Sequence, residues 1–147
     1  MTAVTVRQVL DSTLETVSQL EKLAVEVARR AGFRGLSLDQ ISLATHETAT
    51  NAVVHGNQYR TEKKVFVAIL MTEDRFEIKI ADEGDGFDPG ALPDPLAPQE
   101  LFRGSGRGIY LSRAFMDEYH VQSRDVGGTE VTLIKYLRPR AINRSAM

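Results

Sequence analysis

The sequence predicts an α/β two-layer sandwich with a mostly antiparallel sheet. Two stretches with helical spacing of apolar residues lie in the first half of the chain, and two pairs of β-branched, apolar segments follow, each joined by a short polar turn. Such hairpins pair antiparallel, because a parallel pair needs a long crossover connection. At 147 residues, we expect one domain over residues 1–137 and a loose C-terminal tail over residues 138–147.

Residues 4–10 predict a first strand, because Val4 and Val6 alternate with polar residues. An amphipathic helix is expected next. A capping box at residues 12–15 provides its start, apolar residues then recur at helical spacing, and Gly32 provides its end.

Two further helices are predicted. The first runs from a capping box at residues 37–40 to about His55, where Gly56 and Asn57 end it. The second covers residues 108–119, where apolar side chains meet on one face at helical spacing.

The remaining segments predict two hairpins and a long loop. Residues 65–71 and 76–81 form the first hairpin, and residues 119–124 and 129–137 form the second. Residues 87–103 contain four prolines and a glycine, and therefore predict an irregular loop. Loops of this length are often functional, and many act as lids over a site.

Composition restricts the class of function. The chain has no cysteine, which excludes disulfides, cysteine nucleophiles and thiolate metal sites. Eighteen Lys and Arg stand against twenty Asp and Glu, so we expect no nucleic-acid partner. The longest apolar run, residues 65–71, is far shorter than the roughly 20 residues that span a bilayer, and the N-terminus does not resemble a signal peptide. We therefore expect a cytoplasmic protein without a membrane partner.

Three polar segments in order suggest a nucleotide site, and the first lies on the second predicted helix. Glu47 and Asn51 are spaced i and i+4, so their side chains project from the same face, and His55 extends that face by one turn. A carboxylate can accept a proton from an attacking hydroxyl, and an amide oxygen suits Mg²⁺. Taken alone, a solvated helix surface would be the favoured interpretation.

The second segment is an acid followed by alternating glycines. Asp82 follows a predicted strand, and Gly84 and Gly86 allow the backbone to turn sharply and approach a ligand closely. An acid there could accept a hydrogen bond from an exocyclic amine such as that of adenine. A bare turn is the alternative. A calcium loop is disfavoured, because Gly84, Gly86 and Pro93 occupy positions where an EF-hand needs oxygen ligands.

The third segment is rich in glycine. Gly104, Gly106 and Gly108 precede a predicted helix and could present backbone N–H groups and the positive end of the helix dipole to phosphates. Arg103 and Arg107 could neutralise phosphate charge. The segment is neither a dinucleotide fingerprint, which needs a βαβ unit, nor a Walker loop, since Gly-Lys-Ser/Thr is absent from the sequence. An ordinary loop is the alternative.

In this order, the three segments resemble the N, G1 and G2 boxes of the GHKL ATPase superfamily. The small size and the stretch from Glu47 to Gly56 are most similar to the anti-sigma-factor serine kinases of bacterial partner switching. The resemblance covers about residues 4–137. It implies the Bergerat fold, which is the histidine-kinase-like ATP-binding sandwich.

The resemblance also implies roles for single residues. Glu47 would be the general base, Asn51 would bind Mg²⁺, and Asp82 would accept a hydrogen bond from the adenine amino group. Thr129, which follows two glycines, matches a threonine that backs the adenine site. The glycines of the second and third segments would shape the adenine and phosphate ends, and residues 87–103 would be the ATP lid.

The function implied by the resemblance is that of an ATP- and Mg²⁺-dependent protein-serine kinase that is also an anti-sigma factor. It would bind a sigma factor and phosphorylate a serine of an anti-sigma-factor antagonist protein, and a homodimer is a further family expectation. The alternative is a nucleotide-dependent partner-switch binding module with little or no kinase activity. A complete histidine kinase or a gyrase-type ATPase is not expected, because 147 residues leave no room for their additional domains.

Overall fold

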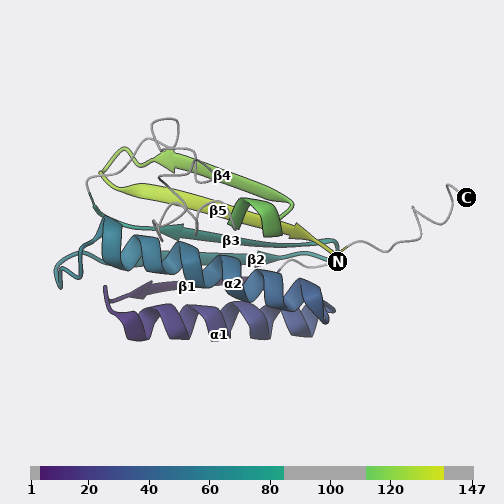
Figure 1. The fold of residues 1–147 in the computed structure, drawn as a ribbon. Helices are drawn as coiled ribbons and strands as arrows, with labels where there is room; N and C mark the ends of the chain where they lie inside the picture. Colours follow the sequence, from purple (N-terminus) through teal and green to yellow (C-terminus); the bar gives the residue numbers. More distant parts are fainter. Residues whose placement is uncertain (1–3, 85–111, 138–147) are drawn as a thin grey trace, which may run out of the picture.

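The computed structural model describes residues 4–84 and 112–137. Figure 1 shows two layers, with helices α1 and α2 side by side on one face of a sheet. The predicted two-layer α/β sandwich is confirmed. Its elements are β1 (Val4–Leu10), α1 (Leu14–Ala31), α2 (Leu36–Thr50), the π-helix η1 (Asn51–Gly56), β2 (Val65–Met71), β3 (Arg75–Ala81), β4 (Glu118–Ser123) and β5 (Thr129–Tyr136).

The sheet has five described strands in the order β1-β2-β3-β5-β4, and every neighbouring pair is antiparallel. Both predicted hairpins, β2–β3 and β4–β5, are present. After β3 the chain reaches the edge of the sheet as β4 and returns as β5, which lies between β4 and β3. The end of β3 therefore lies beside the start of β5, with Ala81 opposite Glu130.

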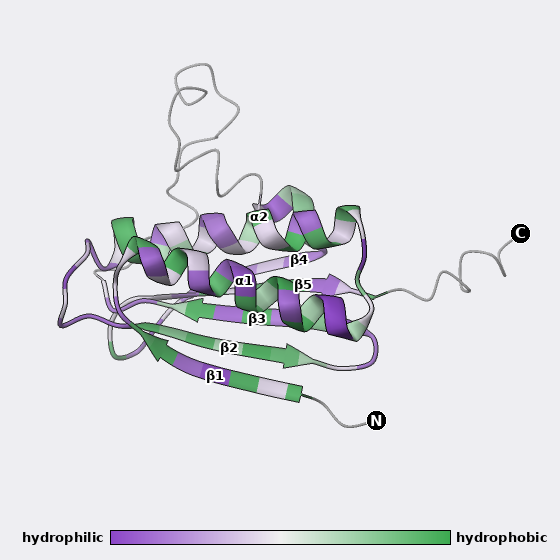
Figure 2. Ribbon diagram, turned by 90° about the horizontal axis from the view of Figure 1, so that it is seen from below, coloured by the Kyte–Doolittle hydropathy of each residue, from purple (hydrophilic) through white to green (hydrophobic). Residues whose placement is uncertain are grey.

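The core lies between the sheet and the helices. Successive side chains of a strand point to opposite faces, and β2 accordingly alternates between buried and half-buried positions along its length. Figure 2 shows β2 as apolar throughout, beneath helices whose hydropathy varies around their circumference. The buried apolar side chains of α1 recur at spacings of three and four, as expected for one helical face packed on a sheet; they are Val17, Leu20, Ala24 and Ala28.

The start of α1 differs from the predicted capping box. Thr13, not Ser12, is the N-cap, and its side chain accepts a hydrogen bond from the N–H of Thr16. The hydroxyl of Ser12 is engaged elsewhere, because it donates to the carbonyl of Lys63 and accepts from the side chain of Asn57. A tertiary contact has therefore replaced a local one.

The start of α2 also differs from the prediction. The helix begins at Leu36 after Gly35, which has φ of 57° and provides no side-chain cap, so the box at residues 37–40 is not used. The predicted end of this helix near Gly56 is confirmed, but the last six residues form a π-helix, in which the N–H of Asn57 bonds the carbonyl of Ala52.

The third predicted helix ends earlier than expected. Residues 112–115 are helical, whereas β4 already begins at Glu118. Contacts with β5 cause this early end: Lys135 Nζ donates to the carbonyl of Phe115 at 2.7 Å, and the N–H of Asp117 donates to Ile134 at 2.9 Å. In the described part of the chain, no helix combines the length and apolar character needed to cross a membrane.

Candidate nucleotide-binding site

Asp82 occupies a core position at the end of β3. It continues the buried, helix-facing stripe of Ile78 and Ile80, and only 6% of its surface is exposed. Its Oδ1 accepts the N–H of Gly84 at 2.9 Å and that of Thr129 at 3.3 Å. Within the described residues, its Oδ2 accepts no hydrogen bond. Among the described residues, one oxygen of this buried carboxylate therefore has no donor.

Burial sets the protonation behaviour of this carboxyl. Desolvation raises the pKa of Asp82, and the two backbone N–H groups and the cations Arg124 and Lys63 only partly oppose the rise. Arg124 also fixes the backbone here, because its Nη1 donates to the carbonyl of Asp82 at 2.9 Å and its guanidinium lies 4.9 Å from the ring centroid of Phe66. A buried carboxyl whose pKa is raised by desolvation is a candidate for a functional position.

Thr129 carries a hydroxyl that the described part of the protein leaves without a partner. The residue is 1% exposed, and its Oγ1 makes no hydrogen bond there. Its backbone makes two hydrogen bonds with Asp82: the Thr129 carbonyl accepts the Asp82 N–H at 2.9 Å, and the Thr129 N–H donates to the Asp82 side chain. An unsatisfied buried hydroxyl costs about 1–3 kcal/mol. A ligand edge that bears both a donor and an acceptor would satisfy Asp82 and Thr129 together, and the amino group and ring nitrogen of adenine form such an edge.

Three glycines bring the surrounding backbone segments together. A Cβ on Gly56 would lie 2.5 Å from the carboxylate of Asp82, and a Cβ on Gly84 would lie 2.0 Å from the carbonyl oxygen of Gly56. A Cβ on Gly128 would lie 1.9 Å from the carbonyl oxygen of Asp82. The end of η1, the turn after β3 and the start of β5 can therefore converge only because these residues lack side chains.

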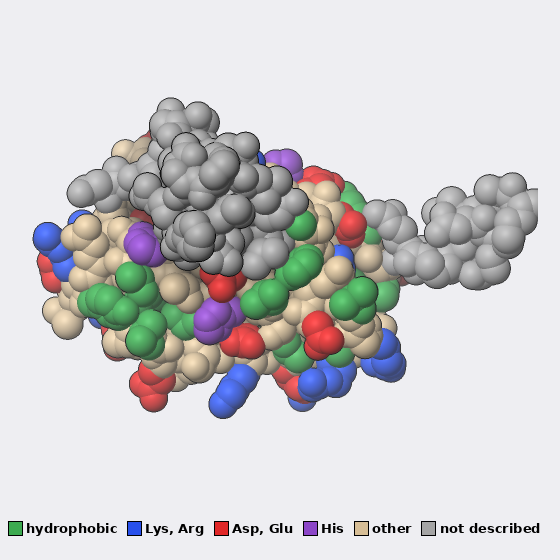
Figure 3. Space-filling view, in the orientation of Figure 1, with side chains coloured by type: hydrophobic (Ala, Val, Ile, Leu, Met, Phe, Trp, Pro, Cys, Tyr) green, Lys and Arg blue, Asp and Glu red, His purple; other side chains and the backbone are tan. Residues whose placement is uncertain are grey.

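Glu47 and Asn51 lie one helical turn apart where α2 passes into η1. The N–H of Asn51 bonds the carbonyl of Glu47, so the spacing of an α-helix holds between them, and both residues are half-buried. Glu47 lines a hollow of about 470 Å³ along the outer side of α1 and α2, with Glu21 and His46 among its other lining residues. Figure 3 shows acidic and histidine side chains close together on this face of the molecule.

Comparison with known proteins identifies the family. A family model described as "Histidine kinase-like ATPase domain" matches residues 10–135. The chain belongs to the histidine kinase-like ATPase family. The predicted resemblance to GHKL ATPases and the predicted Bergerat-type fold are thereby confirmed.

Curated members of the family resemble the chain over most of its length. Serine-protein kinase RsbW of Bacillus velezensis is 34% identical over 124 residues, which cover 80% of this chain and 76% of the relative. The protein of the same name from Bacillus subtilis is 33% identical with the same coverage. That of Listeria monocytogenes is 26% identical over 126 residues, which cover 82% of this chain and 79% of the relative.

The structure of this histidine kinase-like ATPase domain gathers part of the predicted site. Asp82, Gly84 and Thr129 meet at one end of the sheet, whereas Glu47 and Asn51 lie on the helix layer. His55 is exposed, and the wider turn of a π-helix changes its alignment with Asn51 from that of an α-helix, so its role stays a prediction. The remaining predicted residues and the lid, residues 87–103, lie outside the described residues; these site residues are Gly86, Arg103, Gly104, Gly106, Arg107 and Gly108.

Sequence reasoning missed the contribution of Asn57, Arg124 and Gly56 to this site. Gly56 and Asn57 lay directly behind the first polar segment but were given no role beyond ending a helix, and Arg124 lay at the end of a predicted strand. The signal available for Gly56 and Asn57 was their place directly after His55, whereas Arg124 had none.

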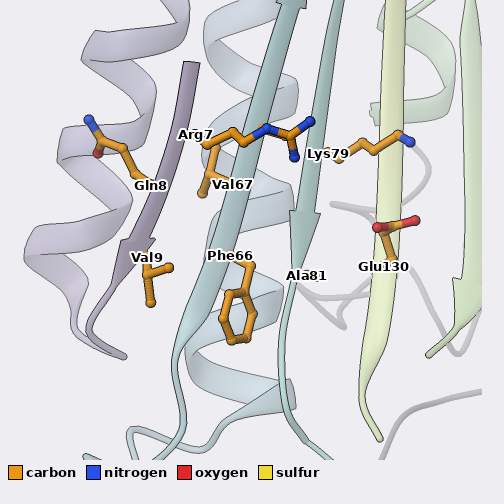
Figure 4. Close-up of a pocket in the computed structure, with 9 residues that line it drawn as sticks. Arg7, Gln8, Val9, Phe66, Val67, Lys79, Ala81 and Glu130 are labelled. Atoms are coloured by element: carbon orange, nitrogen blue, oxygen red, sulfur yellow. The ribbon is translucent and has the colours of Figure 1, made fainter. Parts of the chain in front are cut away.

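A second hollow of about 430 Å³ lies on the sheet face opposite the helices. Figure 4 shows side chains from β1, β2, β3 and β5 around it, among them Arg7, Phe66, Lys79 and Glu130. None of the predicted nucleotide-site residues lines it. Among the described residues, the hollow therefore shares no lining residue with the proposed nucleotide site.

Proposed function

We propose that this protein is an ATP- and Mg²⁺-dependent protein-serine kinase and anti-sigma factor, which binds a sigma factor and phosphorylates a serine of an anti-sigma-factor antagonist protein. The observation that carries the proposal is the buried hydroxyl of Thr129, without a partner among the described residues and in backbone contact with the buried Asp82. The reaction class is supported by the relatives named serine-protein kinase.

Adenine fits the groups around Asp82. Asp82 Oδ2 would accept a hydrogen bond from the amino group, and the Thr129 hydroxyl would gain the partner that it lacks among the described residues. Gly56 leaves room beside the carboxylate, because any side chain there would strike it. The site therefore favours a base with an amino group at this edge over one with a carbonyl oxygen, which Asp82 would repel.

Asn51 would hold the Mg²⁺ ion through its amide oxygen. In residues 4–84 and 112–137, no three side chains of His, Asp or Glu converge on a preformed metal cage. This donor set suits an ion that takes most of its ligands from phosphates and water. When bound, Mg²⁺ would neutralise charge on the phosphate chain.

Glu47 would act as the general base. Its carboxylate, one helical turn from Asn51, would orient the hydroxyl of the acceptor serine and accept its proton. Phosphoryl transfer depends mainly on positioning and electrostatic stabilisation, so no covalent intermediate with the protein is needed.

Replacement of the proposed base tests the kinase mechanism. Glu47→Ala should lower the rate of phosphate transfer to the antagonist serine by about 10²- to 10⁴-fold, because a general base typically contributes that much. Its ADP affinity should stay at the parent value, since Glu47 makes no necessary contact with the nucleotide. Radiolabel transfer and calorimetry measure the two quantities, with Glu62→Ala as a control at an exposed glutamate.

The outcomes separate the alternatives. A parent-like transfer rate in Glu47→Ala would assign the base to another residue. A parent protein that binds ATP and ADP without transferring phosphate would be a partner-switch binding module. Failure of the parent protein to bind adenine nucleotides at millimolar concentration would remove the proposal.

A homodimer and a cytoplasmic location complete the proposal. Both are supported by the resemblance to anti-sigma-factor kinases. Sedimentation of the full chain tests the first, since a purely monomeric protein at high micromolar concentration would contradict it.

A further inference from the structure

Asn57 is completely buried, yet its polar side chain is fully engaged. Its Nδ2 donates to Ser12 Oγ at 2.8 Å and to the carbonyl of Lys64 at 3.0 Å, and its Oδ1 accepts the N–H of Glu83 at 2.7 Å. These partners come from the segment before α1, the segment before β2 and the turn after β3. We call Ser12, Asn57, Lys64 and Glu83 the Asn57 clamp.

Further hydrogen bonds close the Asn57 clamp into a network. The N–H of Lys64 donates to Glu83 Oε1 at 2.6 Å, and the hydroxyl of Ser12 donates to the carbonyl of Lys63. The backbone N–H of Asn57 donates to Ala52 at 2.8 Å, which fixes the last turn of η1. A network that uses both donors and the acceptor oxygen of a buried asparagine holds the connected segments in one arrangement.

The clamp borders the Asp82 carboxylate on two sides. Glu83, which Asn57 holds through its N–H, lies between Asp82 and Gly84, and the Gly84 N–H donates to Asp82 Oδ1. Gly56 directly precedes Asn57 and lies against the same carboxylate. One side chain thus fixes both the turn that orients Asp82 and the backbone packed against it.

We propose that Asn57 is a positioning residue for base recognition, because its side-chain oxygen holds the Asp82–Gly84 turn at the end of η1. The inference rests on the proposed nucleotide site, although Asn57 itself would not bind the ligand, because protein groups already engage both donors and the acceptor oxygen of its side chain. An asparagine is required because it offers one acceptor to Glu83 and two donors to the other segments. Leucine of similar size offers neither, and aspartate offers only the acceptor.

Two variants separate positioning from stability. Asn57→Leu removes all three side-chain hydrogen bonds, whereas Asn57→Asp keeps an acceptor for the Glu83 N–H and loses the donors. Ser12→Ala is the matched control, because it removes one bond of the same clamp and leaves the bond between Asn57 and Glu83 in place. Each full-length variant is studied at a temperature where circular dichroism shows it to be folded.

The measured quantity is the preference for ADP over an ADP analogue that lacks the 6-amino group, obtained from two calorimetric dissociation constants. The parent should prefer ADP by about ten- to a hundredfold, as expected for a hydrogen bond to a charged group. Asn57→Leu should reduce this preference to within about threefold, while Asn57→Asp and Ser12→Ala should retain most of it. A loss of stability alone would leave the ratio unchanged in every folded variant.

Three results would overturn the inference: a parent-like preference in Asn57→Leu, an equal loss in Asn57→Asp, or an equal loss in Ser12→Ala. If Asn57→Leu does not fold, Asn57→Ser replaces it, because its hydroxyl is too short to reach the Glu83 N–H. A parent protein that binds neither nucleotide would instead contradict the proposed function, so the two failures are distinct.

Discussion

The carboxylates of Glu21 and Asp82 lie in polar clusters that differ in burial and in how many of their polar groups have hydrogen-bond partners. Glu21, on α1, is partly exposed, and each of its oxygens has a partner on α2: Ser42 Oγ at 2.6 Å and His46 Nδ1 at 3.0 Å. Asp82 is buried, and among the described residues its Oδ2 and the adjacent Thr129 hydroxyl have no partner. The cluster that joins two helices is complete, whereas the described residues leave two polar groups of the cluster at the proposed site without a hydrogen-bond partner.

The pKa values of the two carboxyls shift in opposite directions. The hydrogen bond from Ser42, with further help from His46, lowers the pKa of Glu21 although burial opposes it. Burial raises the pKa of Asp82. Glu21 therefore contributes stability above pH 4.5 that is lost as the pH falls through its folded-state pKa. Asp82 instead reduces stability as the pH rises from 3.8 through its folded-state pKa.

The largest expected effect tests how tightly the Asp82 cluster is packed. Gly128→Ala should lower the free energy of unfolding by about 3–5 kcal/mol, because the residue has φ of 97° and its Cβ would strike the Asp82 carbonyl. Gly127→Ala is the matched control, with φ of 102° and open space around its Cβ, and should cost only about 1–2 kcal/mol of backbone strain. Urea unfolding measures both, and equal losses would contradict the close approach.

The next effect tests whether Asp82 lowers the stability of the nucleotide-free protein while it strengthens ADP binding. Asp82→Asn should weaken ADP binding by about 1–3 kcal/mol, because an amide N–H would face the adenine amino group. The same variant without nucleotide should be more stable than the parent at pH 7, since the buried charge is gone, and this gain should vanish below pH 3.8. Calorimetry and thermal unfolding across pH measure the two effects. Unchanged ADP affinity would separate Asp82 from base recognition.

A smaller effect compares two buried hydroxyls that lack partners among the described residues, those of Thr129 and Thr45. Replacing either threonine by valine keeps the shape and removes an unsatisfied polar group, so each variant should be about 1 kcal/mol more stable without nucleotide. Only Thr129→Val should weaken ADP binding, because Thr45 lies within α2, away from Asp82. Equal ADP affinity in the two variants would show that the Thr129 hydroxyl does not meet the base.

The sequence predicted most of the fold because strands and helices follow local periodicity. The β-branched and aromatic residues of the segment 65–71 and the helix-ending glycine at Gly32 are local signals, and both predictions are confirmed. The helix starts were less predictable, since a serine can cap a helix or bond elsewhere. Ser12 bonds Asn57, 45 residues away, and Thr13 caps α1 in its place.

For the candidate site, the sequence suggested residue types and their proposed chemistry, whereas the geometry around them could not be predicted. The acid at Asp82 and the threonine at Thr129 were found through their glycine-rich surroundings and the family resemblance. The π-helical turn and the burial of Asn57 depend on contacts between segments far apart in the chain. Gly56 illustrates the limit, because a helix-ending glycine and a glycine packed on a carboxylate look identical in sequence.

The smallest expected effect concerns Glu21, the carboxylate whose oxygens are both satisfied. Glu21→Gln should lower the free energy of unfolding at pH 7 by less than about 1 kcal/mol, because the side chain is 36% exposed and solvent screens its interactions. The difference should disappear as the pH falls below 4.5 through the folded-state pKa of Glu21, since the parent carboxyl then becomes neutral as well.

Glu21→Gln should also leave ADP affinity at the parent value, in contrast to Asp82→Asn. Urea unfolding at several pH values, together with calorimetry, measures both properties in the same pair of variants. A tenfold change in ADP affinity for Glu21→Gln would mean that the helix-joining cluster and the nucleotide site are coupled through α2. In that case, the presence or absence of hydrogen-bond partners around a carboxylate would not indicate which of the two clusters binds the nucleotide.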